Sequence, residues 1–78
     1  MAEVPSSPVV IRFHRSLYLP DAVRTAAGRF AALGAVTVEE RDADTIVVVG
    51  GVADHLRGRV ADELGNHALH ETIRERRR

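Results

Sequence analysis

The 78 residues of this chain suffice for one domain, and a core of that size buries only about 60–65% of the surface that the unfolded chain exposes. Eleven Arg balance eleven Asp and Glu, so the chain lacks the basic excess that is typical of a nucleic-acid-binding domain. The absence of cysteine excludes disulfides and thiolate metal sites. The sequence shows neither a signal peptide nor an apolar run of about 20 residues, which predicts a cytoplasmic protein that does not enter a membrane.

The first two elements follow a polar leader. Residues 1–8 contain two prolines and two serines and are predicted to be a disordered leader, with a single α+β domain over residues 9–78. Residues 9–14 alternate apolar and other side chains, which predicts a strand. Pro20 and Asp21 then suit the first turn of a helix. Its apolar stripe comprises Ala22, Val23, Ala26, Ala27, Phe30 and Leu33. Gly34 is predicted to end this helix by adopting a positive φ.

The second half of the chain reads as a hairpin followed by a helix. Residues 36–40 alternate, residues 45–49 are β-branched at every position, and the short polar loop between them predicts an antiparallel pair. Residues 53–77 are helical in composition. Beyond Gly65 and Asn66, the apolar Leu69 and Ile73 lie about 100–140° away from the earlier apolar stripe. We expect a continuous helix with a weak point at Gly65; a break there is the alternative.

The predicted fold is α+β with the order β-α-β-β-α: a three-stranded, mainly antiparallel sheet with two helices packed on one face. The third strand is expected in the middle, as in a ferredoxin-like half, with a right-handed crossover. The face under the helices is expected to carry Val9, Ile11, Phe13, Val36, Val38, Ile46 and Val48. The open face is expected to show Val10, Thr37, Val47 and Val49.

No motif in the sequence assembles catalytic chemistry. His67 and His70 share one side of a helix and could bind a metal with Glu63 or Glu71, but the spacing matches no zinc signature, and surface histidines are the favoured interpretation. The serines have no evident base beside them in sequence. We therefore predict a protein that is not an enzyme, with no cofactor and no metal site.

Two segments resemble a known family. Residues 17–30 are similar to the first-helix region of His-Xaa-Ser system protein D (HxsD), with matches at Tyr18, Ala22, Val23, Ala26, Ala27 and Phe30; Asp21 stands for the usual acidic residue, and Gly28 departs from the usual aromatic. Residues 63–71 align with the family's "L-L-N-D-Y-x-L-R-E" signature, where Leu64, Leu69 and Glu71 match. Gly65, His67 and His70 depart from that signature.

The resemblance implies an accessory role. HxsD-like proteins are small accessory proteins of peptide-modification systems, in which paired radical S-adenosylmethionine (SAM) enzymes act on a precursor peptide with His-Xaa-Ser repeats. The implied partners are the precursor peptide or the radical SAM maturase, and no catalytic residue is carried over. The competing hypothesis is a structural subunit that forms a homodimer and binds no peptide.

The first strand is predicted to be the contact site, because it forms an unguarded sheet edge. Residues 9–13 contain no proline and one charge, so a partner strand, or the same strand of a second copy, can pair with this edge. Arg12 and Arg15 are expected to select acidic residues. The predicted partner-binding residues are Val10, Arg12, Arg15, Val47, Val49, Leu69 and Ile73.

Overall fold

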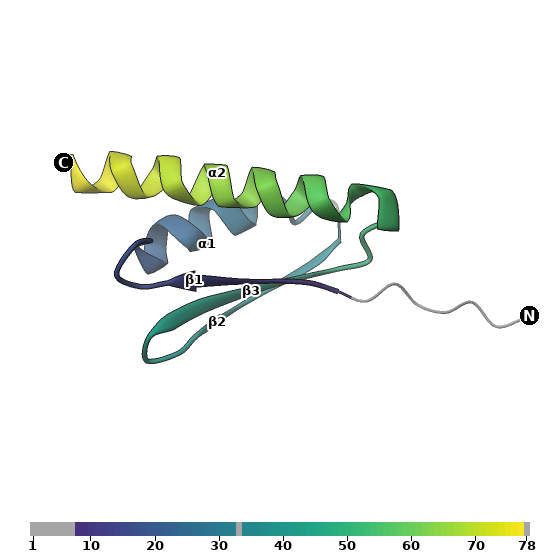
Figure 1. The fold of residues 1–78 in the computed structure, drawn as a ribbon, viewed down its shortest axis with the longest axis horizontal. Helices are drawn as coiled ribbons and strands as arrows, with labels where there is room; N and C mark the ends of the chain where they lie inside the picture. The colour runs from purple at the N-terminus through teal and green to yellow at the C-terminus, as the bar shows by residue number, and fades with distance from the viewer. Residues whose placement is uncertain (1–7, 33, 78) are drawn as a thin grey trace, which may run out of the picture.

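The computed structural model describes residues 8–32 and 34–77 (Figure 1). Its elements are β1 (Val9–His14), α1 (Pro20–Gly28), β2 (Ala35–Glu40), β3 (Asp44–Gly50), the 3₁₀ turn η1 (Asp54–Leu56) and α2 (Arg57–Arg76). The predicted β-α-β-β-α order is confirmed. Residues 1–7 of the predicted leader lie outside the described residues.

The sheet has the order β1-β3-β2, and β3 is antiparallel to both of its neighbours. The prediction that the third strand lies in the middle is therefore confirmed, and β1 and β2 are the two edges. Figure 1 shows α1 and α2 on the same side of the sheet, with α2 running along the length of β1. Helix α1 lies over β2 and β3, so the molecule has one layer of helices on one layer of strands.

The side chains of β3 that face the helices are not the ones that we predicted. Val49 and Val47 stand across from Val9 and Ile11, on the side of the sheet that the helices cover. Both valines are fully buried, so their predicted place on the open face is wrong. Five consecutive β-branched residues carry no period of two, and the register with β1 decides which side of β3 is buried. Ile46 and Val48 consequently lie on the open face, where they are half-buried.

Helix α1 ends earlier than predicted, at Gly28 rather than before Gly34. The backbone N–H groups of Arg29 and Phe30 donate to carbonyls three residues earlier, which tightens the chain and brings Phe30 into the core. Leu33 lies outside the described residues. Among the described residues the positive φ belongs to Gly51, at 77°. Gly34 has a different role: a Cβ there would overlap the carbonyl oxygen of Gly50.

Helix α2 is continuous through Gly65, as we expected. It is tied to the segments that flank β1. Arg57 Nη2 donates to the Pro8 carbonyl (3.3 Å) and Arg76 Nη2 donates to the Ser16 carbonyl (3.2 Å). Buried Thr72 accepts a hydrogen bond from the N–H of Leu19, the residue before α1 (3.2 Å). The helix therefore runs parallel to β1 and lies above it from one end to the other (Figure 1).

Replacing Gly34 or Gly65 by alanine should have opposite effects on stability. Gly34→Ala should lower the free energy of unfolding by about 1–3 kcal/mol, because the new methyl group overlaps backbone that cannot rotate away. Gly65→Ala should raise it by about 1 kcal/mol, because alanine favours the helix and its Cβ meets no other segment within 4 Å. Urea denaturation of both variants measures this. Equal effects of the two substitutions would contradict the close approach of Gly34 to Gly50.

Candidate functional site

The outer edge of β1 is the candidate site, and the register defines which backbone groups lie there. Among the described residues, β1 has a strand neighbour on one side, which is β3. Just past the strand end, the Arg15 N–H donates to the Ala43 carbonyl at 2.9 Å, in register with the ladder. Antiparallel ladders alternate, so Ile11 directs its N–H and C=O toward β3. Val10 and Arg12 direct theirs toward the free edge.

The side chains of these two residues lie on the open face of the sheet. Val10 is 60% exposed, and the Arg12 side chain is 72% exposed. The predicted accessibility of both residues is confirmed. Arg12 Nε lies 3.6 Å from a carboxylate oxygen of Asp44 on the neighbouring strand. The free edge thus combines outward main-chain groups with one aliphatic and one cationic side chain.

The rest of the open face consists of the residues of β3 and β2 that lie beside Val10 and Arg12. Val10 stands opposite Val48, and Arg12 stands opposite Ile46. Beyond Ile46, Glu39 of β2 forms an ion pair with Arg41 at 2.9 Å. The face is therefore apolar near the start of β1 and charged toward the hairpin.

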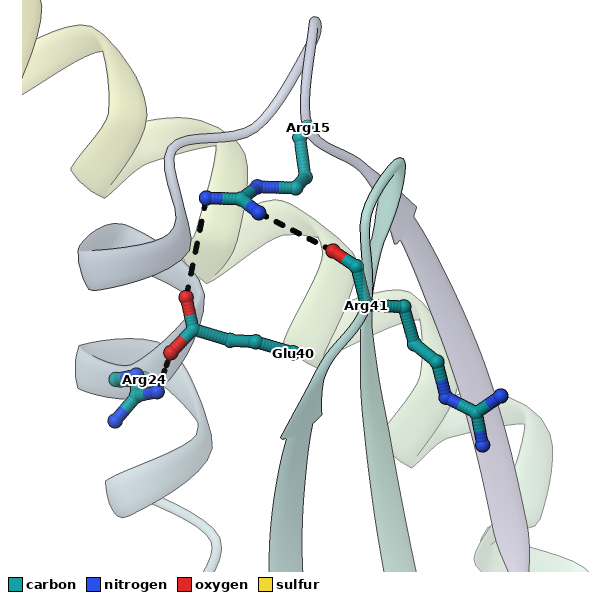
Figure 2. Close-up of polar contacts among 4 residues, drawn as sticks. All are labelled: Arg15, Arg24, Glu40 and Arg41. Carbon is teal, nitrogen blue, oxygen red and sulfur yellow. Dashed lines mark hydrogen bonds and ion pairs between the residues drawn. The ribbon is translucent and has the colours of Figure 1, made fainter.

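Arg15 is engaged inside the chain. Its Nη1 donates to the Arg41 carbonyl (3.1 Å), and its Nη2 lies 4.0 Å from Glu40 Oε1. The other oxygen of Glu40 pairs with Arg24 of α1, and Figure 2 shows this carboxylate between the two guanidinium groups. These contacts tie the turn after β1 to the hairpin and to α1. We therefore assign Arg15 a structural role, and its selection of acidic residues stays a prediction.

The other predicted contact residues divide into two groups. Val47 and Val49 are fully buried beneath the helices, which places them out of reach of a partner on the open face. Leu69 and Ile73 are 46% and 44% exposed on α2, away from the buried Leu64 and Ala68. Their predicted separation from the buried stripe is confirmed.

A serine–histidine contact escaped the sequence interpretation. Ser16 Oγ lies 2.7 Å from His14 Nδ1, and the Ser16 N–H donates to the same nitrogen at 3.2 Å. The i, i+2 spacing just after the predicted strand 9–14 was the available signal. Because the Ser16 N–H donates to Nδ1, the imidazole acts as a turn cap, much as an Asx side chain does. The pair is exposed, and neither of the surface hollows described next includes it.

Two shallow hollows lie elsewhere on the surface. One, of about 320 Å³, is lined by Arg15, Leu19, Pro20, Asp21, Glu40 and Glu75. Glu40 already pairs with two arginines, so this lining leaves little to converge on a ligand. The other, of about 200 Å³, is lined by Leu56, Arg59, Val60 and Glu63. Neither hollow places a nucleophile beside a base.

The two histidines of α2, His67 and His70, have different environments. The ring of half-buried His67 meets Phe30 edge-on, with the centroids 6.1 Å apart, whereas His70 is exposed. Over residues 8–32 and 34–77, no group of three or more His, Cys, Asp or Glu side chains is placed to hold a metal ion. Within the same ranges, no helix is both long and apolar enough to cross a membrane.

Comparison of the chain with protein-family models, with curated proteins and with solved structures finds no match.

The structural role of Arg15 predicts a measurable coupling with Glu40. A double-mutant cycle of Arg15→Ala and Glu40→Ala should give a coupling energy of about 0.2–1 kcal/mol that falls as salt is added, because the pair is partly exposed. The exposed Arg59–Glu63 pair, four residues apart on α2, serves as the reference cycle. Zero coupling at Arg15, together with weaker partner binding by Arg15→Ala, would instead place this guanidinium on a partner.

Proposed function

We propose that this protein is a non-catalytic binding module that receives an extended segment of a partner along the free edge of β1. The observation that carries the proposal is the outward row of Val10 and Arg12, whose main-chain groups and exposed side chains occupy one unpaired edge. Added strands gain affinity from main-chain hydrogen bonds and selectivity from side chains on alternate positions. This edge offers both.

The edge is held rigidly, which favours binding. Val9 and Phe13 are 5% and 2% exposed, so β1 is anchored in the core through its alternate residues. Arg57 and Arg76 hold α2 over the two ends of the strand. A preformed edge loses little conformational entropy when a partner pairs with it.

The other edge strand, β2, is better guarded. It ends in two glutamates, and Glu40 is bridged to Arg15 and to Arg24 of α1. Charged and covered edges resist the addition of a strand. The β1 edge carries Arg12 as its one formal charge between Val9 and Phe13, so β1 is the stronger candidate.

The resemblance to HxsD supplies the proposed biological setting. In that setting the protein works in the cytoplasm as an accessory of a peptide-modification system, and it holds the precursor peptide or the radical SAM maturase. The extended conformation needed at β1 suits a precursor segment that has no fold of its own, because main-chain pairing tolerates many side chains. The proposal involves no nucleic acid and no membrane.

A structural homodimer is the second candidate. It is favoured by the exposed Leu69 and Ile73 on α2, which form apolar surface that a second copy could cover. Light scattering distinguishes the two functions in part. A stable dimer that binds neither maturase nor precursor supports the structural subunit, whereas a complex with either partner supports the binding module.

Proline substitution at an outward-facing residue tests the β1 edge without breaking the hydrogen bonds between β1 and β3. Val10→Pro removes one outward N–H and leaves the ladder to β3 intact, so we expect roughly fivefold to tenfold weaker binding to the proposed partner, a radical SAM maturase or a precursor peptide. Isothermal titration calorimetry measures the change. Ile11→Pro is unsuitable, because its N–H faces β3.

The matched control is Val36→Pro, which removes an outward N–H from the opposite edge strand. It should leave partner binding unchanged. Circular dichroism checks that both variants are folded. A folded Val10→Pro protein that binds its partners as the unmodified chain does would exclude the β1 edge as the binding site. Val10→Lys then offers a gentler test of the open face beside it.

A further inference from the structure

We infer that the segment received by β1 is an acidic strand, with Asp or Glu beside Arg12 and an aliphatic residue beside Val10. This inference rests on the proposed function and specifies the chemistry of the partner. It follows from which β1 residues face the free edge and from the charges that surround them.

The first step is geometric. A residue of an added strand that stands opposite Arg12 has its Cβ within about 5.5 Å of the Arg12 Cβ, and on the same face of the sheet. The residue opposite Val10 lies two positions further along an antiparallel partner. On the open face, β1 therefore contacts the partner side chains that stand beside Val10 and Arg12.

The second step is electrostatic. Arg12 Nε lies 3.6 Å from a carboxylate oxygen of Asp44, its diagonal neighbour on β3. Over the described residues no other ion pair of Arg12 is found, and its side chain is 72% exposed. The open-face row of β1 is Val10, Arg12 and His14, which contains no acid. A partner carboxylate on the outer side of Arg12 would give this guanidinium a second acidic neighbour, in addition to Asp44.

The same charges disfavour a second copy on this edge. If two β1 strands paired antiparallel in the register that sets Ile11 of one copy opposite Ile11 of the other, Arg12 of each would stand opposite Val10 of the other. The two guanidinium groups would then share one face, without a new carboxylate between them. These two arginines would be diagonal neighbours, about 7–8 Å apart and within reach of each other, so a different, acidic strand fits the edge better than this pairing.

The aliphatic position follows from the neighbouring row. Val10 is 60% exposed although it stands beside half-buried Val48. A β-branched residue opposite Val10 would extend this row and bury apolar surface on both strands. The predicted ligand pattern is therefore an acid and an aliphatic residue two positions apart, in a segment free of proline.

Two fluorescein-labelled synthetic peptides test the inference. Both alternate Thr and Val over the same length, and they differ only in a central Glu or Lys. Fluorescence anisotropy should show the Glu peptide binding the full chain about threefold to fivefold more tightly than the Lys peptide. The difference should shrink at about 0.5 M salt. Arg12→Glu should reverse the preference, whereas Arg59→Glu, a matched change on exposed α2, should keep it.

The outcomes separate this inference from the proposed function. Equal binding of the Glu and Lys peptides overturns the acidic preference and leaves strand addition standing. If neither peptide binds, the acidic preference is likewise overturned, and the Val10→Pro result then decides whether the edge is used by another kind of strand. An unchanged preference in Arg12→Glu assigns the selection to a different residue and also overturns the inference.

Discussion

Helix α2 is fastened along the edge strand β1, and the rest of the structure depends on this attachment. Its contacts reach main-chain groups at the Pro8 carbonyl, the Leu19 N–H and the Ser16 carbonyl. Beneath it, Leu64 and Ala68 are fully buried and close the core over the sheet. A chain this short has little apolar surface to bury, and α2 adds Val60, Leu64 and Ala68 to the core.

This attachment explains why the molecule is one-sided. Both helices lie on one face, which leaves the second face and the outer edge of β1 uncovered in the part of the chain that the structure describes. The same residues, Val10 and Arg12, belong to the open face by their side chains and to the free edge by their backbone groups. A partner strand along this edge would therefore contact main-chain hydrogen-bonding groups, an aliphatic side chain and a charged side chain at one place.

The polar clusters elsewhere act within the chain. Glu40 joins Arg15 and Arg24 (Figure 2). His14 caps the turn at Ser16. Glu71, which is 8% exposed, lies 3.5 Å from Arg74 and 4.0 Å from Arg29 at the end of α1. The Glu40 and Glu71 groups connect elements that are separate along the chain, whereas the contact between His14 and Ser16 is local. In the Glu40 and Glu71 groups, the carboxylate charges are balanced by arginines of the same chain.

The sequence by itself determined the elements, their order and the central place of β3. The alternation of Val9, Ile11 and Phe13 marks a strand with one buried face, and Pro20 marks the start of a helix. Local patterns of this kind are complete within a few residues, so they can be read without the fold. The exposure of Val10, Leu69 and Ile73 followed from the same periodicities.

Only the tertiary structure decided which face β3 presents, where α1 ends, what Gly34 allows and what Arg15 binds. A run of β-branched residues has no alternation, so Val47 and Val49 are buried because of their register with β1 and β2. Gly34 is required by the distant carbonyl of Gly50. The guanidinium of Arg15 is taken up by a hairpin 26 residues further along the chain. Each of these outcomes depends on a partner that is remote in sequence, which no local pattern specifies.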